Sequence, residues 1–320
     1  MQRACVARGV QRFDPVAYQL RPDESVTDGL QRLARKELKA AREGLGQHAP
    51  PSDEAIHEAR KSVKKVRAIA QLIDADEGDG LADGPKKLRG VSRTLSALRD
   101  ADAMIEMLTK LRKRNPRLMS EHAFARLRRW LSGCKQSAMD AAKRDDAWTA
   151  VERRLKKVRS GAKRWRPSHP RFGALAAGIR SAHKRGRKAL AQAKDSGGAA
   201  DFHEWRKEMK ALWYSLRLVE GCATGIRKDV EQLHHAERWL GDDHNLVLLC
   251  AELSKDASVC GGPLELDRVR LAVDRYQKVL RGQAMAATRR IYAQKSAAYV
   301  RSVKRAWKAR KTDQRARAAA

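Results

Sequence analysis

The chain has 320 residues, with 69 lysines and arginines against 38 aspartates and glutamates, and therefore a formal net charge of +31. Apolar residues make up 42% of it, which is enough for a hydrophobic core, and no apolar run approaches the ~18 residues needed to span a bilayer. We therefore expect a soluble protein of one or two domains with no membrane insertion. The excess of positive charge indicates a polyanionic partner, such as nucleic acid, an anionic membrane surface or another phosphate polymer.

Cysteine usage and the N-terminus both indicate the cytoplasm. The five cysteines are odd in number and contain no Cys-x-x-Cys pair, which is typical of free thiols in a reducing compartment. They are Cys5, Cys134, Cys222, Cys250 and Cys260. Residues 1–20 lack the uninterrupted apolar segment of a secretory signal, so we expect a cytoplasmic protein.

Apolar residues recur at three- and four-residue spacing along almost the whole chain, whereas alternating strand patterns are rare. The sequence therefore predicts an all-α protein in which only residues 10–20 resemble an extended segment. Ser52, which follows two prolines, is the expected N-cap of the second helix. The expected helices cover residues 23–46, 53–74, 85–113, 120–143, 146–163, 172–194, 201–219, 226–240, 243–257 and 264–312.

The Arg-Pro-Ser-His-Pro segment at residues 166–170 interrupts the helical pattern near the middle of the chain. We expect this segment to separate two domains. The expected division is an N-terminal segment at 1–20, a first helical bundle at 21–165, a second bundle at 171–312 and a basic, disordered tail at 313–320.

The two halves of the sequence are related to each other. Residues 57–64, His-Glu-Ala-Arg-Lys-Ser-Val-Lys, align with residues 203–210, His-Glu-Trp-Arg-Lys-Glu-Met-Lys, at an offset of 146. A second match follows at an offset of 145, between residues 93–102 and 238–247. We therefore predict two related bundles, each burying its own core, packed about a pseudo-two-fold axis that brings two equivalent faces together.

The repeated string places basic side chains on one helical face, because its positions are spaced i, i+3, i+4 and i+7. Like charges at this spacing destabilise a helix by about 0.2–0.5 kcal/mol per pair, so the face requires a compensating anion. Glu58 and Glu204 lie about 100° away in helical projection and are not expected to supply it. The first copy holds His57, Arg60, Lys61 and Lys64, with Arg67 at its edge, and the second holds His203, Arg206, Lys207, Lys210, Tyr214 and Arg217.

A single charged face of this kind is usually no more than a solvated surface. Its duplication, with different neighbouring residues in the two halves, favours a binding role. Arginine supplies a planar fork of donors for phosphate oxygens and lysine supplies a compact cation. Together they suit an anion with many equivalent oxygens.

Further basic residues occur in the flanking helices of each half. We expect Asp100 and its counterpart Asn245 to cap or fix a neighbouring arginine. Residues 156–171 and 301–320 are also basic and are expected to bind polyanions without selectivity. The third helix carries Arg89, Arg93 and Arg99, matched by His234, Arg238 and His244, and the opening helices carry Lys36 and Lys39 in the first half and Lys184, Arg187 and Lys188 in the second.

Motifs for metal binding and catalysis are sparse. The strings Glu54-x-x-His57 and Glu231-x-x-His234 have the spacing of helical metal ligands, but neither half has the second string that a di-metal site requires. The cations beside His57 would also repel a metal. His57 and His203 either donate to a bound anion or brace the basic face against the next helix. No phosphate-binding loop, nucleophile elbow or zinc motif occurs, so we expect no metal, no cofactor and no catalytic residue.

In these repeated residues the chain resembles a known family. The doubled His-x-x-Arg-Lys-x-x-Lys helix, followed in each half by Leu-(Ser/Gly)-x-x-(Arg/His)-(Asp/Asn), is similar to the CHAD family, the conserved histidine α-helical domains. Residues 18–26 also resemble the start of such domains. The resemblance implies a pair of four-helix bundles with pseudo-two-fold symmetry and a basic central groove or pore that binds inorganic polyphosphate. It also implies a location on polyphosphate granules.

The resemblance further implies which residues bind. The second half has His244-Asn245 where the first has Arg99-Asp100, so the halves are expected to contribute unequally. Some family members carry a triphosphatase domain, but this chain has no Glu-x-Glu-x-Lys string, and we infer no hydrolase activity. We therefore expect a non-catalytic polyphosphate-binding protein. The alternatives are a nucleic-acid-binding protein and a metal-dependent or phosphatase enzyme. The implied face includes His57, Arg60, Lys61 and Lys64 opposite His203, Arg206, Lys207 and Lys210, flanked by Arg93, Arg99 and Arg238.

Overall fold

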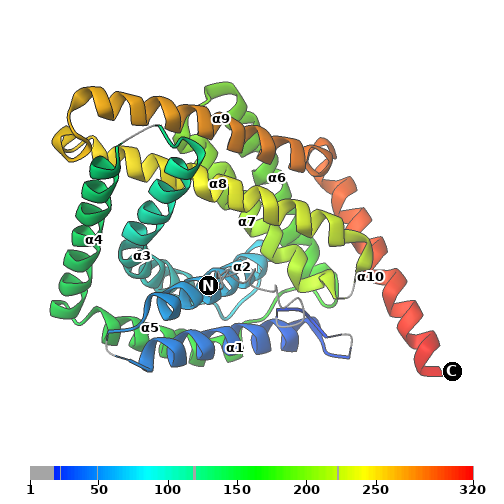
Figure 1. Ribbon diagram of the computed structural model, residues 1–320. Helices are drawn as coiled ribbons and strands as arrows, with labels where there is room; N and C mark the ends of the chain where they lie inside the picture. Colours follow the sequence, from blue (N-terminus) through cyan, green and yellow to red (C-terminus); the bar gives the residue numbers. More distant parts are fainter. Residues whose placement is uncertain (1–17, 22, 49, 118–119, 222, 320) are drawn as a thin grey trace, which may run out of the picture.

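The structure, a computed structural model, describes residues 18–21, 23–48, 50–117, 120–221 and 223–319. Within these residues the chain forms ten α-helices and no strand, so the predicted all-α fold is confirmed (Figure 1). Cys5, Cys222 and most of the expected N-terminal segment lie outside the described residues. The helices are α1 (Val26–Gly46), α2 (Asp53–Ala75), α3 (Gly84–Arg114), α4 (Glu121–Arg144), α5 (Ala147–Gly161), α6 (Gly173–Ser196), α7 (Ala199–Glu220), α8 (Arg227–Leu253), α9 (Pro263–Ala293) and α10 (Ser296–Ala319).

Serine caps fix the start of three helices in the first half. Ser25, Ser52 and Ser120 each accept a hydrogen bond from a backbone N–H three residues later, at the beginning of α1, α2 and α4. Asp53 and Glu54 occupy the first turn of α2, where the helix dipole favours negative charge. The predicted start of the second helix is therefore confirmed.

The structure contains one helix, α8, where the sequence predicted two at 226–240 and 243–257. The expected break at Gly241 is absent, and this glycine lies inside α8 between the buried residues Leu240 and Asp243. A Cβ at Gly241 would come within 3.1 Å of the Arg206 guanidinium. Gly241 therefore allows the Arg206 side chain to lie close to the α8 backbone, and it does not form a turn.

The opposite correction applies to the predicted helix at 264–312, which is divided into α9 and α10 at Gln294. Buried His183 of α6 lies at the break, with Nε2 2.9 Å from the carbonyl oxygen of Ile291 and Nδ1 2.9 Å from Ser296 Oγ. In a continuous helix that carbonyl would bond the backbone N–H of Lys295. The imidazole therefore satisfies a carbonyl that the break leaves open.

Two hydrophobic clusters form the core, and each takes residues from both halves of the chain. The larger joins α1, α2, α5, α6, α7 and α10 to the first halves of α3 and α8 and to the C-terminal part of α9. The smaller joins the second halves of α3 and α8 to α4 and to the N-terminal part of α9. The prediction that each half buries its own core is therefore wrong. The reason is that α2 packs on α6 and α7, and α3 packs on α8, so apolar faces are buried across the central boundary.

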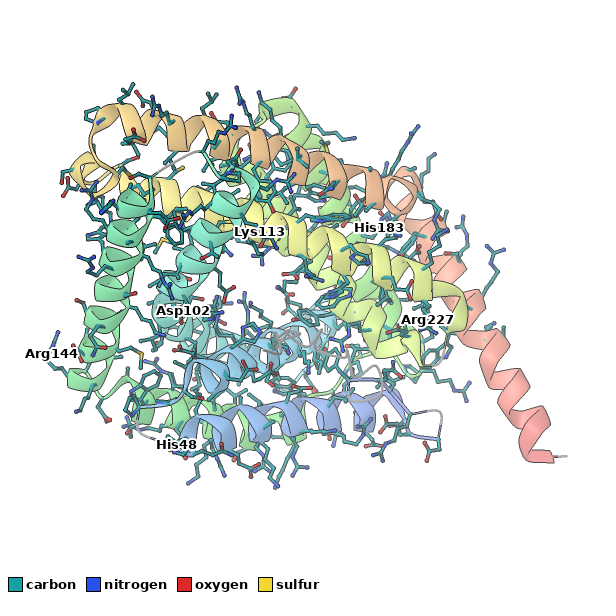
Figure 2. All side chains as sticks on the ribbon, in the orientation of Figure 1. His48, Asp102, Lys113, Arg144, His183 and Arg227 are labelled. Carbon is teal, nitrogen blue, oxygen red and sulfur yellow. The ribbon has the colours of Figure 1, made fainter. Side chains whose placement is uncertain are left out.

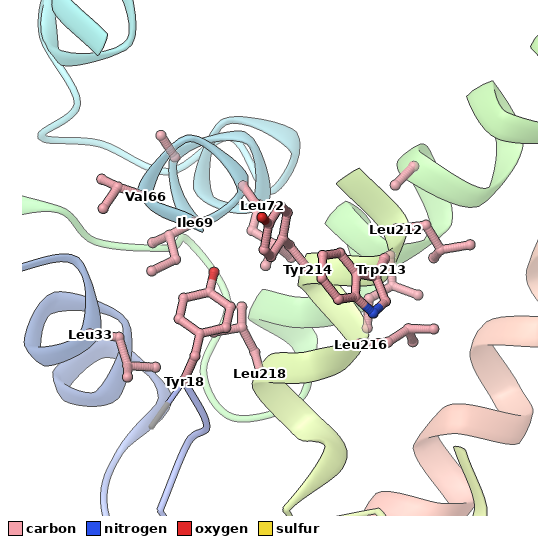
Figure 3. Packing of buried hydrophobic residues seen from close by; sticks show 14 of the residues in the cluster. Tyr18, Leu33, Val66, Ile69, Leu72, Leu212, Trp213, Tyr214, Leu216 and Leu218 are labelled. Atoms are coloured by element: carbon pink, nitrogen blue, oxygen red, sulfur yellow. The ribbon is translucent and has the colours of Figure 1, made fainter. Parts of the chain in front are cut away.

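Tyr18 illustrates the continuity of the larger cluster (Figure 3). Its ring is fully buried and meets Tyr214 of α7 edge-on, with the ring centroids 6.1 Å apart. Its hydroxyl donates to the carbonyl of Lys65 in α2 at 2.9 Å. One side chain before α1 thus connects the two repeated helices. Among the described residues, no helix is long and apolar enough to cross a membrane.

Candidate anion-binding site

The two copies of the repeated basic string lie in α2 and α7, which are in contact with each other. Figure 1 shows both helices, with α3 and α8, around the middle of the molecule. Four of the predicted residues come together there with one carboxylate. We call this set the central cluster; it consists of Arg60 and Lys64 from α2, Arg206 and Lys210 from α7, and Glu237 from α8.

Glu237 neutralises the α7 side of the cluster. Its side chain is buried, accepts a hydrogen bond from Arg206 Nη2 at 2.9 Å and forms an ion pair with Lys210. Burial alone would raise the pKa of Glu237, but the charges of Lys210 and Arg206 hold it well below its usual range. The ionised form of the carboxylate is therefore favoured by its two basic partners.

The α2 side of the cluster is much less neutralised. Arg60 Nη1 lies 3.9 Å from Asp100 Oδ1 of α3, a long pairing to a carboxylate that is 41% exposed. Within the part of the chain that the structure describes, Lys64 forms no ion pair. The facing charge of Lys210, followed by burial and by the charge of Arg60, holds the pKa of Lys64 well below its ordinary value. Four cations thus face two carboxylates, and Lys64 carries most of the unrelieved repulsion.

The outer lysines of both strings are paired, which corrects the expectation for Glu58 and Glu204. Lys61 Nζ lies 2.7 Å from Glu58 Oε1, and Lys207 Nζ lies 2.6 Å from Glu204 Oε2. Both are i, i+3 pairs, and the long side chains bridge the angle that separates their Cβ atoms. The expected pairing of Asp100 with a neighbouring arginine is confirmed by its contact with Arg60.

The histidines of the repeat are held neutral by their surroundings. His203 and His244 lie ring against ring, with centroids 3.9 Å apart. Burial, followed by the charges of His203 and Arg206, lowers the pKa of His244 to about 4. Burial also lowers the pKa of His57 and of His203. Within the described residues, Nδ1 of His203 is buried without a hydrogen-bond partner.

Two predicted binding residues lie in the core instead. Tyr214 and Arg217 are 4% and 6% exposed, and the Arg217 guanidinium lies over the rings of Tyr18 and Trp213 at 5.4 and 5.1 Å. Both continue the basic face of α7, but they lie in its C-terminal part, where residues 212–219 are all buried, and this burial rather than their helical face removes them from the surface.

The remaining predicted residues do not join the central cluster. Arg67 is partly buried, with Nη1 3.5 Å from Ser92 Oγ, and Arg99 is bound by Asp102 and Glu106 at 3.2 and 2.5 Å. The others are exposed on α1, α3, α6 and α8; they are Lys36, Lys39, Arg89, Arg93, Lys184, Arg187, Lys188 and Arg238.

Sequence reasoning missed Glu237, the residue that most distinguishes the two halves. The second internal match begins one residue later, at Arg238, and its offset aligns Glu237 with Ser92. Comparison of the halves therefore hides this position, because it differs between them. No three His, Cys, Asp or Glu side chains among the described residues lie together as metal ligands would.

Comparison with known proteins identifies the fold. A family model described as the CHAD domain matches residues 32–254. The chain is similar to the crystal structure of the CHAD domain from the plant Ricinus communis, with a TM-score of 0.60, 17% identity and coverage of 92% of this chain and 97% of that one. It is also similar to PptA from Streptomyces chartreusis, with a TM-score of 0.54, 18% identity and coverage of 85% and 99%. No curated protein matches it. Because the family model spans well over half of the residues, the chain belongs to the CHAD domain family.

Proposed function

We propose that this protein binds inorganic polyphosphate through the central cluster, without catalysing its hydrolysis. Membership of the CHAD family, which is associated with polyphosphate binding, supports the ligand class. The observation that carries the proposal is the position of Lys64, which faces Lys210 across the two repeats with no carboxylate of its own. A polyanion is the simplest partner that relieves this repulsion.

The chemistry of the cluster suits a chain of closely spaced phosphates. Arg60 and Arg206 offer planar donor forks, and Lys64 and Lys210 offer compact cations, at positions contributed by both repeats. Each phosphate bound there displaces condensed counterions and also favours the protonated form of Lys64. Affinity should therefore depend steeply on salt.

Several finer features belong to the same proposal. These are the division into repeats at 21–165 and 171–312, a groove or pore along the cluster, and a cytoplasmic location on polyphosphate granules. The distribution of the helices supports the repeats, because five of the described helices precede the central boundary and five follow it. Nucleic acid is the alternative ligand, favoured only by the net charge of +31.

A competition titration tests the ligand. Long-chain polyphosphate is titrated at ~150 mM salt, where exposed charges are screened beyond ~8 Å, with single-stranded and duplex nucleic acid as competitors. We expect tight binding that nucleic acids displace poorly. Equal competition per phosphate would overturn the choice of polyphosphate in favour of nucleic acid.

Two variants test the site. The cluster variant, Arg60→Gln with Lys64→Gln, leaves Glu237 fully paired and so avoids a stranded buried carboxylate. The α4 variant is the control; it replaces the exposed Arg128, Arg129, Lys143 and Arg144 by Gln. Figure 2 shows Arg144 at the outer end of α4. We expect the cluster variant to lose at least about tenfold in affinity and the α4 variant much less, although it removes more charge. An equal loss in both would place binding on the general surface.

A further inference from the structure

We infer that the outer face of α10 is a second polyanion site, which takes the phosphate backbone of nucleic acid. Its residues are spaced i, i+3, i+4 and i+7, the spacing of the basic positions in α2 and α7. They are Arg301, Lys304, Arg305 and Lys308, and all four are exposed. The inference does not depend on the proposed polyphosphate site.

The opposite face of α10 fixes the helix to the body of the protein. Tyr299, Val300, Val303 and Trp307 are each at most 5% exposed and belong to the larger core cluster. The Tyr299 hydroxyl donates to Asp229 Oδ2 of α8 at 3.1 Å. The basic residues therefore stand on a docked helix along the edge of the molecule, where Figure 1 shows α10 extending past the neighbouring elements.

No carboxylate in the same segment balances this face. Residues 275–312 contain twelve lysines and arginines and no aspartate or glutamate. Some exposed bases on other helices pair with an acid of the same helix, as Lys39 does with Glu43 and Arg268 with Glu265. Within the described residues, by contrast, Arg301, Lys304 and Arg305 form no ion pair. Repulsion among these three cations weakens their helix, and a bound polyanion removes that penalty.

The local surface also offers the donors that a phosphate backbone accepts. A pocket of about 620 Å³ is lined by the four basic side chains together with Gln294 and Ser302. Lysine, arginine, serine and glutamine are the residue types that contact phosphate and sugar in nucleic-acid complexes. The face lies on the outside of a helix, so the sugars and bases of a bulky polymer do not collide with a second wall.

Binding of labelled duplex DNA and single-stranded RNA over a range of salt concentrations tests this inference. The α10 variant replaces Arg301, Lys304, Arg305 and Lys308 by Gln, and the α4 variant again serves as the matched loss of four exposed cations. Each phosphate contact contributes about −0.9 to the slope of log affinity against log salt for duplex DNA, so the slope should become shallower by roughly 3 to 4 in the α10 variant. The α4 variant should keep most of the slope, and the α10 variant should keep its affinity for polyphosphate.

Three results would overturn the inference. Nucleic-acid binding that survives in the α10 variant would place the contact elsewhere. Equal losses in the α10 and α4 variants would reduce it to diffuse surface charge. A parallel loss of polyphosphate binding in the α10 variant would make α10 part of the polyphosphate site. Circular dichroism of each variant confirms that the helices remain folded.

Discussion

The α2 and α7 copies of the basic string have the same spacing but opposite electrostatic surroundings. In the α7 copy, Lys210 is paired with Glu237, a buried carboxylate on the next helix. In the α2 copy, the position that corresponds to Glu237 is Ser92, and Lys64 has no pairing carboxylate within the described residues. One copy is therefore internally satisfied, while the other retains a charge available to a ligand.

This difference shows that a duplicated motif does not imply a duplicated role. The α7 copy contributes stability through Glu237 and repulsion toward Lys64, and the α2 copy contributes the cation that needs a partner. Under the proposed function, both copies supply cations to the ligand, and only the α7 copy is also neutralised within the protein. The following predictions test the comparison, beginning with the largest expected effect.

Removal of the neutralising carboxylate should have the largest effect on stability. Glu237→Ala leaves Arg206 and Lys210 close together without an anion, and we expect a loss of about 3 kcal/mol in the free energy of unfolding. Ser92→Ala, at the corresponding position of the first half, should change it by no more than about 0.5 kcal/mol. Urea unfolding measures the stability of both variants. Equal, small losses in the two would contradict the claim that only the α7 copy is neutralised by a buried carboxylate.

Replacement of Lys64, which forms no ion pair among the described residues, should increase stability and weaken polyphosphate binding. Lys64→Met removes the repulsion from Lys210 and Arg60, and we expect a gain of roughly 1 kcal/mol in stability together with weaker polyphosphate binding. Because the pKa of Lys64 is lowered on folding, the unfolded chain holds a proton that the folded chain releases as pH rises through the lowered value. The difference in stability between the variant and the wild type should therefore decrease as the pH rises toward the ordinary pKa of lysine. A variant that is less stable at neutral pH would contradict this account.

The histidine pair should give the smallest effect. A bound polyanion favours protonated His244, whose pKa in the free protein is lowered to about 4, so polyphosphate affinity should rise a few-fold as the pH falls from 7 to 5. His244→Gln should flatten this dependence, whereas replacement of the exposed His48, at the far end of α1, should not (Figure 2). An unchanged slope in His244→Gln would show that the pair only braces the helices.

Much of the fold follows from local pattern, since apolar spacing and serine caps set α1 to α7 within a few residues of the predicted bounds. Two boundaries failed for tertiary reasons. Gly241 stays helical because Arg206 fills the space beside it, and the chain breaks at Gln294 because His183 accommodates the open carbonyl of Ile291. Neither partner is near in sequence.

The site was predictable to the level of two helix faces that meet and no further. The i, i+3, i+4, i+7 spacing correctly groups Arg60 with Lys64 and Arg206 with Lys210. The duplication also predicted that the two repeated faces meet, as α2 and α7 do. The sequence did not reveal that Glu237 enters from α8, because that contact depends on helix packing. Arg217 shows the same limit, since its charge predicts exposure and its aromatic neighbours bury it.

Lysine reactivity measured with and without polyphosphate tests the central claim most directly, because it needs no substitution. A neutral amine acylates faster than a protonated one, so the lowered pKa of Lys64 should favour its acylation in the free protein. Mass spectrometry after brief acetylation should show that polyphosphate protects Lys64 and Lys210 and leaves Lys143 of α4 unchanged. Protection confined to Lys304 and Lys308 of α10, or absent from Lys64, would contradict a polyphosphate site in the central cluster.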